Sequence, residues 1–272
     1  MIKINSELPL CLLRENNDLN EYDFVLFHLY KSNDIYKSYY LKQRVDHPDR
    51  LMILDNSAYE FYVKGEILDL EEYKNAIDEL QPDYYILPDV LMKKNETIHN
   101  LMEFIKRYKP TNSISKPIAV VQGNSNKEFI DCILLYHDFK IQSIAIPFHN
   151  SYFRDIQPRE SIIEDFQNQF GRINEDHKYA MGRIEWVKSY QDLLNKFEHV
   201  HILGSHCPYE KKYYNDFQTM DTGYPVKCAI AGYRLFNESE KPNIIIDEFM
   251  DKTLSDQTKN LIIQNIEKFR SI

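Results

Sequence analysis

The feature that most constrains this chain's fold is a series of short apolar runs, rich in β-branched and aromatic residues, with helical stretches between them. The runs are residues 22–28, 50–54, 83–87, 117–121, 141–146 and 199–203, followed by weaker runs at 217–220 and 244–246. Strands that are apolar almost throughout are typical of a parallel sheet buried on both faces. The alternation therefore predicts an α/β fold of the (β/α)8 barrel type, with a doubly wound sheet as the alternative.

Helical spacing of apolar residues fills the gaps between these runs. The predicted helices are residues 69–81, 96–108, 127–137, 158–170, 184–197 and 248–272. The first has Asp69 at its start, where a carboxylate is favourable, and ends before Pro82. Residues 149–183 form the longest stretch without a clear strand, so we expect a helical insertion there. The chain shows no linker-like segment, and we expect a single domain over residues 1–272.

Composition argues against several classes of function. The chain has only 7 glycines and neither a GxGxxG nor a GxxxxGK[ST] pattern, so a glycine-rich phosphate loop is not expected. Its net charge of −9 argues against a protein that coats nucleic acid, although a local basic patch suffices for an enzyme that binds one nucleotide. The four cysteines are far apart and no secretory signal is recognisable. We therefore expect a cytoplasmic protein with reduced thiols and no membrane span.

Four short segments place a carboxylate or a carboxamide where a predicted strand ends. They are LDNSAYE (54–60), LPDV (87–90), VVQGN (120–124) and MDTG (220–223). In a parallel barrel these strand ends converge on one mouth, so Asp55, Asp89, Gln122 and Asp221 are expected to share a pocket. Three acids and an amide around a concave site suit recognition of a donor-rich ring and nucleophilic chemistry.

The order and the amino-acid sequences of these segments resemble the motifs of the tRNA-guanine transglycosylase superfamily. They are most similar to its phage-type branch, which exchanges guanine for a 7-deazaguanine in DNA. The resemblance implies that Asp221 is the nucleophile, which holds the sugar covalently at C1′, and that Asp55 is the general acid and base. Asp221 also follows a G-x-x-x-P-x-E segment, residues 204–210, as the family's nucleophile does. The chain would then be a pentosyltransferase.

The resemblance also implies how a purine base is held. An ionised Asp89 would accept both N1–H and N2–H of guanine, and Gln122 would contact O6 and N7 or the group at C7. Tyr59 would stack on the purine face. The expected substrate-binding residues are Asp89, Gln122, Gly123, Tyr59, Asn56 and Phe148. The substrates would be guanine-containing DNA and a free 7-deazaguanine base.

The chain departs from the family pattern in four respects. Ser57 and Ala58 stand where the family has two glycines, and Asn124 replaces the second glycine of its V-Q-G-G. Pro147, which has no N–H to donate, stands where backbone amides of the family touch the base. The C-x-C-x-x-C…H cluster that binds zinc in the tRNA enzymes does not follow Asp221. We therefore expect no metal, no cofactor and no zinc subdomain, which favours DNA over tRNA as the substrate.

Other interpretations stay open at this stage. A zinc-free tRNA-guanine transglycosylase is the alternative within the family, and a metal-dependent hydrolase barrel is the alternative of another class. The hydrolase would use the histidines His149, His199, His201 and His206. Taken alone, Asp221 could cap a turn and Asp55 could begin a helix. Scarce Gly with abundant Lys, Asn, Ile and Tyr indicates an AT-rich coding genome, as some phages have, and thus a protein acting in a host cytoplasm. The oligomeric state is left open.

Overall fold

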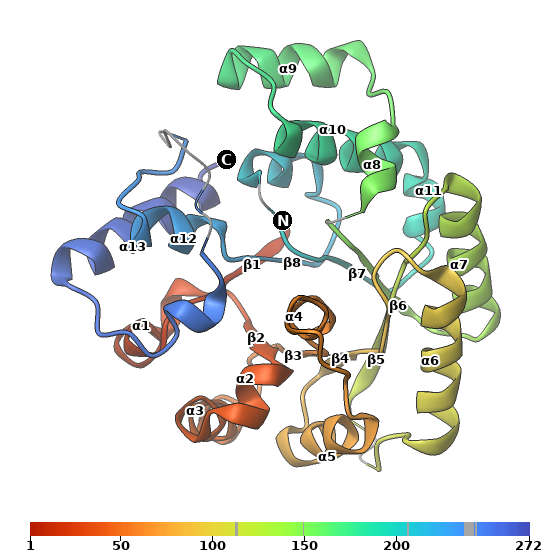
Figure 1. The fold of residues 1–272 in the computed structure, drawn as a ribbon, viewed down its shortest axis with the longest axis vertical. Coiled ribbons are helices and arrows are strands. Elements are labelled where there is room, and N and C mark those ends of the chain that lie inside the picture. Colours follow the sequence, from red (N-terminus) through yellow and green to blue (C-terminus); the bar gives the residue numbers. More distant parts are fainter. Residues whose placement is uncertain (112–113, 149, 206, 237–241, 243) are drawn as a thin grey trace. The chain divides into compact units, whose positions relative to one another are not determined.

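The computed structural model describes residues 1–111, 114–148, 150–205, 207–236, 242 and 244–272. Its strands, labelled in Figure 1, are β1 (Lys3–Ser6), β2 (Asp23–Leu26), β3 (Met52–Asp55), β4 (Tyr84–Ile86), β5 (Lys116–Val120), β6 (Ser143–Ile146), β7 (His199–Ile202) and β8 (Thr219–Thr222). They form one sheet in the order β1-β8-β7-β6-β5-β4-β3-β2. The expected α/β fold is confirmed, because parallel strands in this order, with helices between most of them, follow the plan of a (β/α)8 barrel.

Helices fill most of the connections between strands. The α-helices are α1 (Leu10–Glu15), α2 (Phe27–Ser32), α3 (Asp34–Asp46), α4 (Ala58–Lys64), α5 (Leu70–Leu80), α6 (Lys94–Arg107), α7 (Asn126–Asp138), α8 (Ser151–Asp155), α9 (Glu160–Phe170), α10 (Glu175–Ser189), α11 (Gln191–Leu194), α12 (Tyr224–Ile230) and α13 (Asp256–Arg270). Short 3-10 helices are η1 (Asn17–Leu19), η2 (Pro208–Tyr213) and η3 (Ile246–Glu248). Among the helices of the described residues, none combines the length and apolar character needed to cross a bilayer.

The chain divides into two compact units, which are treated separately below. Unit 1 comprises Met1–Glu21, Phe153–Leu193 and Ile202–Ile272, and unit 2 comprises Tyr22–Tyr152 and Leu194–His201. Unit 1 thus contains β1 and β8, and unit 2 contains β2 to β6. The single-domain boundary expected from the sequence stays a prediction.

Local sequence explains the elements that carry the site in unit 2. All four residues of β2, β3 and β6 are buried, as expected for strands covered on both faces. The helix α5 begins where the Asp69 carboxylate accepts two backbone N–H groups, and it ends at Leu80, with Gln81 as its C-cap, before Pro82 as predicted. Its buried Tyr73 donates a hydrogen bond to Ile86 O at 2.7 Å and also contacts Leu54 O at 3.2 Å. This hydroxyl ties the ends of β3 and β4 together.

Two strand assignments made from the sequence were wrong. Residues 244–246 form no strand, and Ile246 begins η3 instead. The first strand, β1, was not foreseen, because Lys3, Asn5 and Ser6 interrupt any apolar run. It pairs with β8 in parallel, and Asn5 and Ser6 are buried despite their polarity. The strand that carries these polar side chains therefore lies beside the one that carries Asp221.

The helical insertion expected at 149–183 is present as α8, α9 and most of α10, and residue 149 lies outside the described part. The helix predicted at 184–197 is instead the end of α10 followed by α11, with Tyr190 between them. Gly182 of α10 lies against the Phe153 backbone, where an added β-carbon would stand 1.8 Å from the carbonyl oxygen. A larger residue at 182 would force α8 and α10 apart.

Candidate functional site

In unit 2 a strained turn joins β3 to α4. Ser57 has a positive φ of 57°, which non-glycine residues rarely adopt, and its N–H donates to the Asp55 carboxylate at 2.7 Å. The Ser57 hydroxyl accepts the backbone N–H of His28 at 3.1 Å and lies 3.0 Å from His28 Nδ1. Both side chains are buried. The turn is therefore held from two sides, and with it the orientation of the Asp55 carboxylate.

The Asp89 carboxylate is held by two carboxamides, an arrangement we call the Asp89 clamp (Asn56, Asp89 and Gln122). Asn56 Nδ2 donates to one carboxylate oxygen at 2.8 Å, and Gln122 Nε2 donates to the other at 2.7 Å. Burial raises the pKa of Asp89, and the two amide hydrogen bonds partly oppose that rise. Each oxygen of a carboxylate can accept more than one hydrogen bond, so the clamp orients Asp89 and leaves it able to bind donors.

The two carboxamides are themselves fixed by the backbone. Asn56 also donates to Leu87 O at 2.8 Å and accepts the Ala58 N–H at 2.8 Å, while Gln122 accepts the Met92 N–H at 2.9 Å. Both side chains are only 1% exposed. These buried side chains thus orient Asp89 by hydrogen bonds. Nothing in the sequence indicated this role, and both residues were expected to contact the substrate.

Gly123, expected at the substrate, has a packing role in the structure. A β-carbon at this position would stand 2.6 Å from Glu128 Cβ, so α7 requires a glycine here. Its carbonyl accepts a hydrogen bond from Asn150 Nδ2 at 2.7 Å. The other two expected contacts differ in exposure: Tyr59 on α4 is 46% exposed, whereas Phe148 is buried. Of these two, only Tyr59 presents a ring to a ligand without rearrangement.

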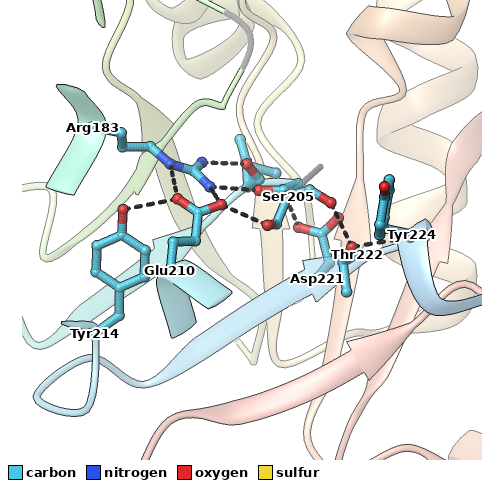
Figure 2. A network of polar contacts seen from close by, with 9 residues as sticks. Arg183, Ser205, Glu210, Tyr214, Asp221, Thr222 and Tyr224 are labelled. Atoms are coloured by element: carbon cyan, nitrogen blue, oxygen red, sulfur yellow. Dashed lines mark hydrogen bonds and ion pairs between the residues drawn. The ribbon is translucent and has the colours of Figure 1, made fainter. Parts of the chain in front are cut away.

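In unit 1 Asp221 ends up buried near the end of β8. Its carboxylate accepts the Gly204 N–H at 2.9 Å, and the side chain is only 4% exposed. Strand pairing sets Asn5 of β1 opposite Asp221 and Ser6 opposite Thr222. The Thr222 hydroxyl donates to Ser205 O at 2.7 Å, so two bonds join the end of β8 to the loop after β7 (Figure 2).

That loop rests on a fully buried ion pair between Arg183 of α10 and Glu210 of η2 (Figure 2). The guanidinium donates to both carboxylate oxygens, at 2.6 and 3.0 Å, and also to the carbonyls of Leu203 and Gly204, at 2.9 and 2.8 Å. Ser205 and Tyr214 hydroxyls donate to the remaining sides of the carboxylate, at 2.5 and 3.0 Å. Arg183 therefore fixes the peptide whose N–H holds Asp221.

Some of these residues could have been found in the sequence and others could not. The G-x-x-x-P-x-E segment points to Glu210, because it sets an acid at a fixed distance from Gly204. Arg183 gave no signal, since it lies in the middle of a helix 27 residues earlier. His28 was counted as the end of an apolar run, and its contact with Ser57 depends on the turn between strand and helix.

Two of the histidines of the hydrolase interpretation, His199 and His201, are packed against aromatic rings. His199 lies 4.5 Å from Tyr84 and His201 lies 5.2 Å from Phe24, measured between ring centroids. Within the described ranges no group of three His, Cys, Asp or Glu side chains could hold a metal ion. His149 and His206 lie outside these ranges.

The buried His199 gives a pH-dependent stability that can be measured. Burial, with a smaller contribution from His201, lowers its pKa from 6.5 to about 3. Between these two values the unfolded chain binds a proton that the folded chain excludes. The free energy of unfolding should therefore fall by about 1.4 kcal/mol per pH unit as the pH drops below 6.5.

We expect His199→Phe to remove this contribution, so that urea unfolding curves of variant and parent diverge in acid and keep a constant difference at neutral pH. A constant difference at every pH would contradict the assignment.

The described residues thus contain two polar centres. Unit 2 brings Asn56, Asp89 and Gln122 into direct contact and places Asp55 in the same turn as Asn56, and unit 1 holds Asp221. That Asp221 shares their pocket stays a prediction. A scan against protein-family models finds no match for the chain, and a search of curated proteins finds none either. Fold and site define an α/β protein with carboxylates held at strand ends, which are positions where barrel enzymes carry catalytic groups.

Proposed function

We propose that this chain is a base-exchanging glycosyltransferase that replaces guanine in DNA by a 7-deazaguanine. The observation that carries the proposal is the Asp89 clamp, a carboxylate oriented by two buried carboxamides. A carboxylate in fixed orientation suits the paired N1–H and N2–H donors of guanine and of a 7-deazaguanine, which share this edge. The resemblance of the strand-end segments to the transglycosylase family supports the same substrate class.

Asp221 would supply the nucleophile. Its carboxylate attacks C1′ as the bond to the departing base breaks, and the sugar is then held as an ester-like adduct until the incoming base displaces it. Two displacements at one carbon retain its configuration. The Gly204 N–H, bonded to one carboxylate oxygen, orients the other for attack. The resemblance gives the acid and base role to Asp55, whose carboxylate accepts the Ser57 N–H.

Exchange of labelled guanine into nucleic acid tests this proposal directly. The purified chain is incubated with labelled free guanine and either a guanine-containing DNA duplex or unmodified tRNA, and label retained in the polymer is counted. We expect incorporation into DNA. Incorporation into tRNA alone would replace the DNA assignment by the zinc-free tRNA enzyme, and no incorporation into either polymer would contradict the proposed function.

Tyr59→Ala should weaken binding more than chemistry. The 46% exposed ring is expected to stack on a base that has left the duplex, and such stacking contributes about 1–3 kcal/mol per base. We therefore expect the KM for DNA to rise by about 10-fold or more while kcat changes little. Tyr62→Ala, at an exposed tyrosine of the same helix, is the matched control. Equal effects at both positions would argue against a specific stacking role.

A further inference from the structure

The end of β1 brings a second acid to Asp221. Asn5 stands opposite Asp221 in the strand pairing, and the Glu7 N–H continues the ladder by donating to Thr222 O at 3.2 Å. Side chains two residues apart on a strand share one face of the sheet. Glu7 therefore leaves β1 on the face that carries Asn5 and, opposite it, Asp221.

The Glu7 carboxylate lies against the backbone of Gly223. A β-carbon built on Gly223 would stand 2.3 Å from Glu7 Oε2 and 3.0 Å from Lys227 Cε. The absence of a side chain at 223 thus leaves room for the Glu7 carboxylate, which lies over the backbone directly after Asp221 and Thr222. Lys227, one turn into α12, approaches the same point. The glycine of the M-D-T-G segment is required by Glu7 in this structure.

The surroundings of Glu7 shift its pKa in the direction that favours the protonated acid. Burial raises the pKa of Glu7, Lys227 opposes the rise, and the negative charge of Asp221 adds to it. The Glu7 and Lys227 side chains are both half-buried. A carboxyl group that holds its proton can act as the acid beside a second carboxylate that acts as the nucleophile.

We propose that Glu7 is a further catalytic residue, which donates the proton that the departing base requires and takes it back from the incoming base. The inference rests on the proposed function, and it gives to Glu7 the proton transfer that the family resemblance gives to Asp55. Lys227 would stabilise the Glu7 carboxylate while its proton is on the base. Glu7, Lys227 and Asp221 belong to the same unit, and the side chains of Glu7 and Lys227 both approach Gly223, two residues after Asp221.

Each of the two displacements moves one proton between Glu7 and a base. In the first, an Asp221 oxygen forms a bond to C1′ as the bond from C1′ to the base nitrogen breaks, the electron pair stays on that nitrogen, and the Glu7 proton joins the base. Guanine leaves neutral and Glu7 is a carboxylate. In the second, this carboxylate takes the proton from the ring nitrogen of the incoming base, that nitrogen bonds to C1′, and Asp221 leaves as a carboxylate.

A substrate that needs no proton separates this role from a structural one. A 7-methylguanine nucleotide is cationic and leaves as a neutral base, so its departure requires no acid. The measurement is the rate of covalent adduct formation with DNA containing guanine or 7-methylguanine at one site. We expect Glu7→Gln to slow the guanine reaction by about 100-fold or more and to leave the 7-methylguanine reaction near the parent rate. Gly223→Ala, which displaces the Glu7 carboxylate, should give the same selective loss.

Three variants complete the experiment. Glu21→Gln changes a glutamate that holds the β1 backbone at Ile4 N, so it controls for general disturbance of the strand and should slow neither reaction selectively. Equal slowing of both substrates by Glu7→Gln, or a selective loss in Asp55→Asn instead, would overturn the role of Glu7. If Asp221→Asn forms the adduct with 7-methylguanine DNA as fast as the parent, the proposed function itself fails.

Discussion

Asp221→Asn should abolish base exchange while leaving base binding intact. An amide cannot form the ester-like adduct at C1′, and loss of an enzyme nucleophile lowers kcat by orders of magnitude, so we expect a fall on the order of 10⁴-fold or more. The N–H of Gly204 can still donate to the amide oxygen, so the local fold should survive. The measurements are exchange of labelled guanine into DNA and equilibrium dialysis of free guanine.

The adduct provides the control for that experiment. Denaturing the parent protein during reaction with guanine-containing DNA should trap a covalent complex, and digestion with mass spectrometry should place it on the peptide that contains Asp221. Asp216→Asn, an exposed carboxylate bonded to Gln191, should react as the parent does. An adduct on Asp55, or near-normal exchange by Asp221→Asn, would show that the nucleophile is misassigned.

Glu210→Ala should be the most destabilising single change near the site. It leaves the Arg183 guanidinium fully buried without its carboxylate, and breaking one side of a buried pair costs about 3–5 kcal/mol. Replacing both residues by leucine should recover part of this loss, because no charge is then left unpaired. Urea unfolding measures both effects. Lys178→Ala, which breaks the exposed pair with Glu175, should change stability by less than about 1 kcal/mol.

The double leucine variant also separates stability from positioning. It lacks the guanidinium that holds the carbonyls of Leu203 and Gly204, so the Gly204 N–H is no longer fixed against Asp221. We expect slow exchange even where the protein is well folded. Recovery of exchange in step with stability would contradict a positioning role for Arg183.

The strands and helices that carry strong apolar patterns could be predicted from the sequence. Strands β2 to β8 lie within a few residues of their expected places, because a buried strand needs apolar side chains on both faces. Strand β1 was not predicted, because it lacks such an apolar run. Its Asn5 and Ser6 are buried beside polar residues of β8, so its burial is satisfied by contacts that no local pattern encodes.

The placement of the four polar side chains at strand ends could be predicted from the sequence, and their hydrogen-bond partners could not. Strand ends pointed to Asp55, Asp89, Gln122 and Asp221, since each follows an apolar run. A carboxamide has two donors and an acceptor, and which partners it finds depends on neighbouring loops. The commitment of Gln122 to Asp89 and Met92, and the reach of Arg183 to the loop before β8, arise only when distant segments fold together.

The Asp89 clamp affects which bases the proposed site would bind. Asn56 and Gln122 hold the carboxylate by its two oxygens, so the group cannot turn aside for a ligand of different polarity. Adenine presents an unprotonated ring nitrogen where guanine presents N1–H, and two acceptors would then face each other. A site that accepts hydrogen bonds from a ligand discriminates strongly against an analogue that lacks the donors. A hydrophobic pocket discriminates far less against a ligand that lacks one methyl group. A rigidly held Asp89 would therefore make the proposed site selective for guanine over adenine.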